Sequence, residues 1–297
     1  MKTKNKGYSA YIAGITIILV LTFTYVVSPT ALIRLDYLFQ NIHFQLRGPI
    51  EPASNIVIAE IDEKSIDILG RWPWPRSTFA KITENLSNLN ASIIAFDVIF
   101  SSPEKNPLED NLIELGKLIP ENSSAKDYLK QLINENNADE IFAKALSDGS
   151  NTVLGYFFHF SPEGLDHLTE EKRHQFFEDI KKSQFRGFLK SRSDLDITQI
   201  PFPKAYAIES NLASFSNAAS GSGYLTFNVD LDGMIRRLPL MVRFHDSSTK
   251  TNSYFPPLSL RILETYLEGT LLFRVGEAGM EEVIMDSDES VIIPTNP

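Results

Sequence analysis

The chain has 297 residues and a formal net charge of −10; 43% of its residues are hydrophobic and 22% are charged. This composition suits one large globular domain with an appendage, and the acidic balance argues against a nucleic-acid partner. The chain contains no cysteine, which excludes thiolate nucleophiles, cysteine-bound metals and disulfides. It does not fix the cellular compartment.

The first strong pattern in chain order is an uncharged apolar run over residues 8–27. As a helix it would be roughly 30 Å long, the thickness of a hydrocarbon core, so it predicts a transmembrane helix. A cleaved signal peptide is the alternative, disfavoured because the run is long and its exit is a poor cleavage site. Lys2, Lys4 and Lys6 precede the run without an acidic residue. They predict a cytoplasmic N-terminus (residues 1–7), a single pass through the inner membrane and a periplasmic or extracellular main domain.

A stalk helix is predicted next, over residues 28–50. Apolar side chains recur there at steps of three and four, at Leu32, Leu35, Phe39, Ile42 and Leu46. Gly48 and Pro49 predict its end. The apolar seam packs either on the chain's own domain or against the same helix of a second subunit in a homodimer, and both alternatives stay open.

Residues 51–297 are predicted to form one extracytoplasmic α/β domain. Three short apolar runs read as buried strands, over residues 55–61, 92–100 and 151–158. Helical patterns separate them, which predicts a largely parallel β-α-β-α-β core. Residues 101–138 are polar and predict an exposed excursion with one helix. A hairpin around the DLDG turn at 230–233 and a helix over 258–267 complete the predicted fold.

The sequence lacks the common catalytic motifs. The sequence has no phosphate-binding loop, nucleophile elbow or paired-histidine zinc motif, and its five histidines are scattered. We therefore predict no catalytic residue, no metal and no cofactor. The DLDG segment imitates half of a calcium loop, but Pro239 stands where the bidentate glutamate belongs. Residues 165–192 mix basic and aromatic side chains, and we interpret them as an amphipathic helix with a solvated face rather than a binding surface for nucleic acid or lipid head groups.

Both tryptophans of the chain lie in one stiff segment, GRWPWPR at residues 70–76. Prolines fix their own φ and restrict the residue before them, so Trp72 and Trp74 are held in extended geometry. Such a loop either plugs the end of a sheet or forms the wall of a ligand site. We favour the plug and keep the ligand wall as the alternative.

Two carboxylates, Asp62 and Asp97, fall at the carboxyl ends of the first two predicted strands. Open α/β sheets bind ligands at that edge, and the tryptophan segment leaves from it. The two acids either hold a metal or act as acid and base, or they form a structural cluster with arginines such as Arg71, Arg76 and Arg236. We favour the structural cluster, because no third acid or histidine accompanies the pair.

Several segments together resemble the CHASE2 domain, the second type of cyclases/histidine kinases associated sensory extracellular module of bacterial receptors. The resemblance rests on IVIAEID at 56–62, LGRWPWPR at 69–76, NASIIAFDVIF at 90–100, DEIFAKAL at 139–146 and GYLTFNVDLDGMIRRLPL at 223–240. It implies a sensory role with an unassigned signal. The residues it carries over are Trp72, Trp74, Arg76, Asp97, Asp232 and Arg236.

The resemblance also implies a receptor whose C-terminal part is truncated here, because family members continue into membrane helices and an output domain such as an adenylate or diguanylate cyclase or a kinase. We therefore expect the signal-input domain of a membrane-bound receptor, with a small-molecule or envelope signal as its ligand and no enzyme activity in this region. The alternatives are a membrane-anchored extracytoplasmic hydrolase using Asp62 and Asp97, and a non-signalling envelope binding protein. The candidate ligand contacts are Asp62, Arg71, Trp72, Trp74, Arg76, Asp97 and Arg236.

Overall fold

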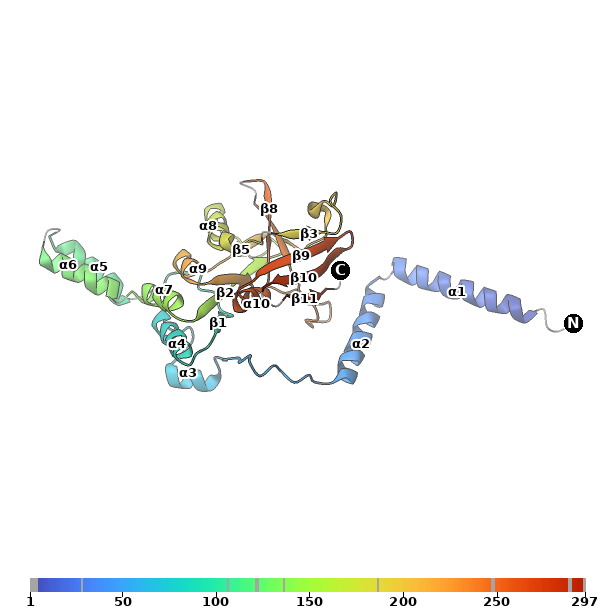
Figure 1. Ribbon diagram of the computed structural model, residues 1–297, viewed down its shortest axis with the longest axis horizontal. Helices are drawn as coiled ribbons and strands as arrows, with labels where there is room; N and C mark the ends of the chain where they lie inside the picture. The colour runs from blue at the N-terminus through green and yellow to red at the C-terminus, as the bar shows by residue number, and fades with distance from the viewer. Residues whose placement is uncertain are drawn as a thin grey trace. The chain divides into compact units, whose positions relative to one another are not determined.

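The computed structural model describes residues 5–27, 29–105, 107–120, 123–135, 137–185, 187–246, 249–287 and 290–295 (Figure 1). The chain divides into two compact units. Unit 1 comprises residues 1–61 and 229–236, and unit 2 comprises residues 62–228 and 237–297.

Unit 1 contains two helices, α1 (Asn5–Val27) and α2 (Pro29–Arg47). Helix α1 coincides with the run that predicts a membrane anchor. Among the described residues, however, no helix combines the length and the apolarity needed to cross a membrane, so the structure does not support the predicted span. Lys2 and Lys4, which gave the predicted orientation, lie outside the described residues.

The helix predicted over residues 28–50 is present as α2, over Pro29–Arg47. It ends where the sequence indicates: Gly48 has a φ of +70°, which favours glycine, and its N–H donates to the carbonyl of Phe44 at 3.1 Å. This bond satisfies one of the carbonyls that a helix leaves unpaired at its C-terminus. Leu35, Phe39 and Leu46 of the apolar seam are 51%, 60% and 80% exposed, so half or more of each side chain is uncovered.

The predicted strand over residues 55–61 is not formed. The segment is extended but carries no strand assignment, and Ile56, Val57 and Ile58 are 71%, 86% and 88% exposed. Strand patterning in a sequence becomes a strand only when another strand pairs with it, and no pairing of this segment is present in the described part of the chain. The first of the two predicted β-α-β units is therefore wrong.

Unit 2 holds the remaining elements. Its α-helices are α3 (Glu63–Leu69), α4 (Arg76–Asn88), α5 (Pro107–Leu118), α6 (Ser124–Glu135), α7 (Ala138–Asp148), α8 (Glu170–Ile180), α9 (Ala213–Ala218) and α10 (Leu258–Tyr266). Its strands are β1 (Ile93–Phe96), β2 (Asn151–His159), β3 (Phe188–Lys190), β4 (Lys204–Ala205), β5 (Ala207–Glu209), β6 (Gly221–Tyr224), β7 (Val242–Asp246), β8 (Thr251–Phe255), β9 (Thr270–Gly276), β10 (Gly279–Asp286) and β11 (Val291–Pro294).

The central sheet confirms a mixed α/β fold with parallel pairing. Strand β2 pairs in parallel with β1 and with β6, and antiparallel with β5. Ile93 lies opposite Asn151, and Val153 lies opposite Gly221. Helices α4 and α7 contact each other and cover this sheet (Figure 1). The crossover from β1 to β2 through α7 is thus the predicted second β-α-β unit.

Two further sheets extend the domain. One has the order β11-β10-β9-β3 and the other the order β4-β7-β8. The predicted hairpin around the DLDG turn is wrong, because β6 joins the central sheet and the hairpin is formed by β7 and β8 instead. The predicted C-terminal helix is confirmed as α10. At Gly223 a side chain would meet the backbone of Leu258 at 2.6 Å, so β6 approaches α10 as closely as only glycine permits.

The excursion over residues 101–138 contains two helices where the sequence analysis expected one. Helices α5 and α6 lie side by side (Figure 1), and Lys126 Nζ on α6 donates to the carbonyl of Gly116 on α5 at 2.6 Å. Leu129 of α6 is 5% exposed, which shows that the two helices bury a small apolar face of their own.

Candidate functional site

The tryptophan segment is built into the aromatic core of unit 2. Trp74 is 4% exposed, and its indole N–H donates to the carbonyl of Gly70 at 2.8 Å. The ring centroids of Trp72 and Phe79 lie 5.9 Å apart in an edge-to-face arrangement. Phe79, on the buried face of α4, lies 5.0 Å from Phe100 in the same arrangement. These contacts support the plug over the ligand wall for Trp74, while Trp72 remains 39% exposed.

Arg76 holds the same region together. Its guanidinium carbon lies 4.5 Å above the ring of Phe100, and Nη2 donates to the carbonyl of Ser102 at 3.1 Å. Nε lies 3.5 Å from Asp139 Oδ1 of α7. The backbone N–H of Arg76 donates to Glu104 Oε2 at 2.6 Å, so a carboxylate caps the N-terminus of α4. Arg76 therefore joins α4, α7 and the loop after β1.

Asp62 and Asp97 are both exposed, and no contact joins them in the described residues. Asp62 is the N-cap of α3: its Oδ1 accepts hydrogen bonds from the N–H of Ser65 at 2.8 Å and from the Ser65 hydroxyl at 2.6 Å. These two bonds lower the pKa of the Asp62 carboxyl. Asp97 and Arg71 carry no ion pair in the part of the chain that the structure describes. The expected cluster of buried, arginine-paired acids is thus absent for Asp62 and Asp97.

Arg236 makes the most extensive polar contacts of the predicted site residues, and all of them lie inside unit 1. Nη1 donates to Asp230 Oδ2 and to Asp232 Oδ1, both at 2.8 Å. Nη2 donates to Asp232 Oδ2 at 2.6 Å and to Asn41 Oδ1 at 2.8 Å, and Nε donates to the same Asn41 oxygen at 3.3 Å. The guanidinium carbon also lies 4.7 Å from the ring centroid of Tyr37.

These contacts use all five N–H donors of the guanidinium. The Arg236 side chain is 3% exposed. Hydrogen bonds to Asp232 and Asp230 raise the pKa of Arg236 further, and the bond from Arg236 lowers the pKa of Asp232 to about 2. Arg236 is therefore saturated by its own chain. We call Arg236, Asp230, Asp232, Asn41 and Tyr37 the α2 clamp.

The α2 clamp depends on local turn geometry. Asp230 N–H donates to the carbonyl of Met234 at 2.9 Å, and Gly233 N–H donates back to Asp230 at 2.9 Å. Gly233 has a φ of +83°, a conformation that glycine adopts without strain. The turn presents both aspartates to the same guanidinium. The DLDG segment is thus a tight turn, as the sequence analysis concluded, but its acids bind Arg236.

Sequence reasoning missed Tyr37 and Asn41, the two α2 members of the clamp. Their spacing of four residues places them on one helix face, but nothing in the sequence links that face to residues 230–236. It also missed Asn211, which is 1% exposed. Asn211 Oδ1 accepts from the N–H of Phe100 and its Nδ2 donates to the carbonyl of Gly155, both at 2.8 Å.

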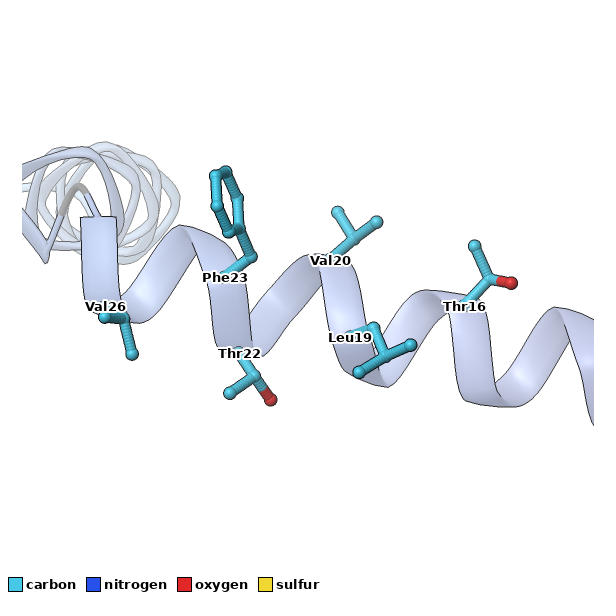
Figure 2. Close-up of a pocket in the computed structure, with 6 residues that line it drawn as sticks. All are labelled: Thr16, Leu19, Val20, Thr22, Phe23 and Val26. Atoms are coloured by element: carbon cyan, nitrogen blue, oxygen red, sulfur yellow. The ribbon is translucent and has the colours of Figure 1, made fainter.

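A hollow on α1 has no features of a ligand site. It is lined by Thr16, Leu19, Val20, Thr22, Phe23 and Val26. Figure 2 shows that all six side chains belong to a single helix and point to different sides of it. The six side chains do not enclose a cavity, so this surface does not indicate a ligand site. In the described residues there is also no group of three or more acids or histidines arranged to hold a metal.

The fold and these contacts describe a mixed α/β domain in which Asp62, Arg76 and Arg236 make hydrogen bonds within their own chain. The family model of the CHASE2 domain matches residues 14–296. The chain therefore belongs to the CHASE2 domain family, a family of sensory extracellular domains, and the resemblance drawn from the sequence is confirmed. Comparisons with curated proteins and with solved structures find no match.

Proposed function

We propose that the chain is the signal-input domain of a membrane-bound receptor and that it passes the signal through α2. Membership in a sensory domain family supports the sensory role. The observation that carries the transmission route is the α2 clamp. Residues 229–236 lie in the chain between β6 and β7. Arg236 joins this segment to Asn41 and Tyr37 of α2. A movement of the end of β6 or of the start of β7 is therefore passed to α2 through Arg236, whose hydrogen-bond donors are all in use.

The two faces of α2 fit such a role. Successive helix residues are rotated by about 100°, so Tyr37 and Asn41 lie opposite Leu35 and Phe39. The clamp thus occupies one face of α2 and leaves the exposed apolar seam on the other. An apolar helix face of this kind is stabilised by a partner in water, and we propose that the partner is α2 of a second copy.

The dimer is tested by cross-linking. Cysteines introduced at Leu35 and Phe39 should form disulfide-linked dimers, whereas a cysteine at Gln40, which hydrogen-bonds Asp36 on the polar side of the helix, should not. Equal reaction at all three positions, or none at the seam, contradicts the proposed homodimer.

We place α1 at the cytoplasmic membrane, with residues 1–7 in the cytoplasm and the main domain outside. The support is that Ile12, Ile18 and Val26, on different sides of α1, are 65%, 64% and 71% exposed. Apolar side chains exposed on several sides of a helix are unfavourable in water. Alkaline phosphatase fused after Gly48 should be active. An inactive fusion, with an active cytoplasmic reporter at the same junction, reverses the orientation.

The output domain, a cyclase or a kinase, is proposed to follow in the same gene. In the full-length product, Arg236→Gln should change the basal output, because α2 is released from residues 229–236. Arg192→Gln removes an exposed arginine of unit 2 and should leave the output unchanged. An unaltered output in a folded Arg236→Gln variant, or a gene that encodes no output domain after codon 297, contradicts the proposal.

A further inference from the structure

Unit 2 contains a cleft that none of the candidate ligand contacts named from the sequence lines. It lies between α8 and the strands β4 and β7, and its volume is about 500 Å³. Ligand pockets for small molecules commonly measure about 300–1,000 Å³, so the cleft accommodates a ligand of amino-acid size. Its lining mixes aromatic rings with charges of both signs.

Arg173 on α8 is the first polar group of the cleft. Its Nε donates to the carbonyl of Leu168 at 3.2 Å, and its guanidinium carbon lies 5.4 Å from the ring centroid of Tyr206. These two contacts hold the side chain from one side. Over the described residues, the terminal nitrogens Nη1 and Nη2 make no hydrogen bond to the protein. An oriented guanidinium with its fork open is the geometry that binds a carboxylate through two hydrogen bonds.

Lys204 on β4 adds a second cation to the same cleft. Its side chain is exposed, and its ammonium forms no ion pair within the residues that the structure describes. Arg173 contrasts with Arg236, whose five donors are all used by its own chain. The cations of the cleft thus retain donors for a ligand.

Two carboxylates balance these cations. Glu170, in the first turn of α8, and Asp246, at the end of β7, also line the cleft. Asp246 is 6% exposed and its Oδ2 accepts from the hydroxyl of Thr249 at 2.6 Å. A simple anion would face both acids, and a simple amine would face both cations. A ligand that carries one charge of each sign avoids both repulsions.

The remaining wall is apolar and aromatic. The rings of Phe177 and Phe244 lie 5.4 Å apart with a tilt of 33°, and Phe160 packs beside the same core. Aromatic surface of this kind binds an apolar side chain, while the polar groups fix the orientation of the ligand.

We propose that this cleft binds a free α-amino acid with an apolar or aromatic side chain. Arg173 and Lys204 bind the carboxylate, Glu170 and Asp246 bind the ammonium, and the phenylalanine rings contact the side chain. The inference that such an amino acid is the sensed signal rests on the proposed sensory function. Its binding to the cleft is tested without measuring the output of the receptor.

The test is isothermal titration calorimetry on the full chain in detergent, with L-phenylalanine and L-leucine as probes. At least one of the two should bind. Each of three partial analogues should bind at least about tenfold more weakly than L-phenylalanine, a loss of about 1.4 kcal/mol. These are 3-phenylpropionate, which lacks the ammonium, phenethylamine, which lacks the carboxylate, and glycine, which lacks the side chain.

Two variants assign the contacts. Arg173→Gln should weaken the binding of L-phenylalanine at least about tenfold, whereas Arg192→Gln, the same change at an exposed arginine outside the cleft, should not. Glu170→Gln should weaken L-phenylalanine binding and spare the residual binding of 3-phenylpropionate. Circular dichroism melting of each variant separates lost binding from lost folding.

Several results overturn the inference. They are binding of neither amino acid, binding of 3-phenylpropionate or phenethylamine as tight as that of L-phenylalanine, and unchanged binding in a folded Arg173→Gln variant. The outcome is independent of the proposed receptor role. Amino-acid binding without any output response contradicts the receptor and leaves the site intact, whereas an output that depends on Arg236 without amino-acid binding contradicts the site alone.

Discussion

Replacing Trp74 by alanine should destabilise unit 2 strongly, because the indole is a structural plug. Trp74 is 4% exposed, donates to the carbonyl of Gly70 at 2.8 Å and lies 6.0 Å from the ring of Trp72 in an edge-to-face pair. Trp74→Ala removes the buried ring, its aromatic contacts and the donor of that hydrogen bond. Large-to-alanine changes at buried aromatic positions cost about 3–5 kcal/mol.

The expected loss is measurable by thermal or urea unfolding. For a domain of this size each kcal/mol corresponds to about 2–4 °C in Tm, so Trp74→Ala should melt roughly 6–20 °C lower. Trp74→Phe keeps most of the apolar ring and loses the N–H. It should cost about 1–3 kcal/mol, since the Gly70 carbonyl then lacks its donor.

Asp97→Asn is the matched control. Asp97 is exposed and has no ion pair within the described ranges, so its change should stay within about 0.5 kcal/mol. An unchanged Tm for Trp74→Ala would refute the plug. A large loss of stability in Asp97→Asn would show that the Asp97 carboxylate has a partner, as the predicted structural cluster with arginines requires.

Three further changes have defined outcomes. Asn211→Ala leaves two buried backbone groups unpaired and should lower the free energy of unfolding by about 1–3 kcal/mol for each group, measured in urea beside the exposed control Asn217→Ala. The pKa of Asp232 is depressed to about 2, so its stabilising effect is present above about pH 4 and lost as the pH falls through 2; Asp232→Asn should therefore be less stable than the wild type at pH 5–7 and equal to it below pH 2. Gly223→Ala should lower the Tm, because the added Cβ would lie 2.6 Å from the backbone of Leu258. Gly164→Ala is the control: its added Cβ has no neighbouring atom within 4 Å, so it measures only the cost of a φ of +76°.

Local signals in the sequence predicted local structure well. The period of apolar residues together with Gly48 predicted α2 and its end, and the uncharged apolar run over residues 8–27 lies within α1, although the membrane span predicted from it is not supported. The strand at 151–158 is also as predicted, and six of the nine residues of β2 are buried. These features depend on residues close in the sequence, whose propensity and periodicity are visible without the fold.

Pairings between distant segments could not be predicted in the same way. Residues 55–61 and 92–100 carry similar strand patterns, yet only the second contains a strand, β1 over Ile93–Phe96, because pairing with β2 decides it. The segment before β7 read as one arm of a hairpin around the DLDG turn, but the turn's acids bind Arg236 instead. A side chain's partner is a tertiary property that its spacing does not reveal.

The same limit applied to the candidate site residues, whose partners the sequence did not show. The sequence singled out arginines and acids as ligand contacts, but it could not tell a saturated charge from an open one. Arg236 has all five donors bound within unit 1. Arg76 lies against Phe100 and Asp139 inside unit 2. Both side chains therefore hold neighbouring segments of their own unit together. The segment that contains Arg173 was interpreted as an amphipathic helix with a solvated face, because a basic residue on such a helix is usually solvated.

The difference between these arginines bears on how a sensory domain divides its work. A residue that transmits motion needs contacts that persist whether or not a ligand is bound, and the α2 clamp meets this need because Arg236 has no donor left for another partner. A residue that recognises a ligand needs the opposite: an oriented group whose terminal donors gain partners only on binding, so that the bound and free states differ in free energy. Arg173 has that arrangement in the cleft beside α8. In the proposed mechanism, recognition and transmission rest on different arginines, and a variant of one should alter its own readout while leaving the other intact.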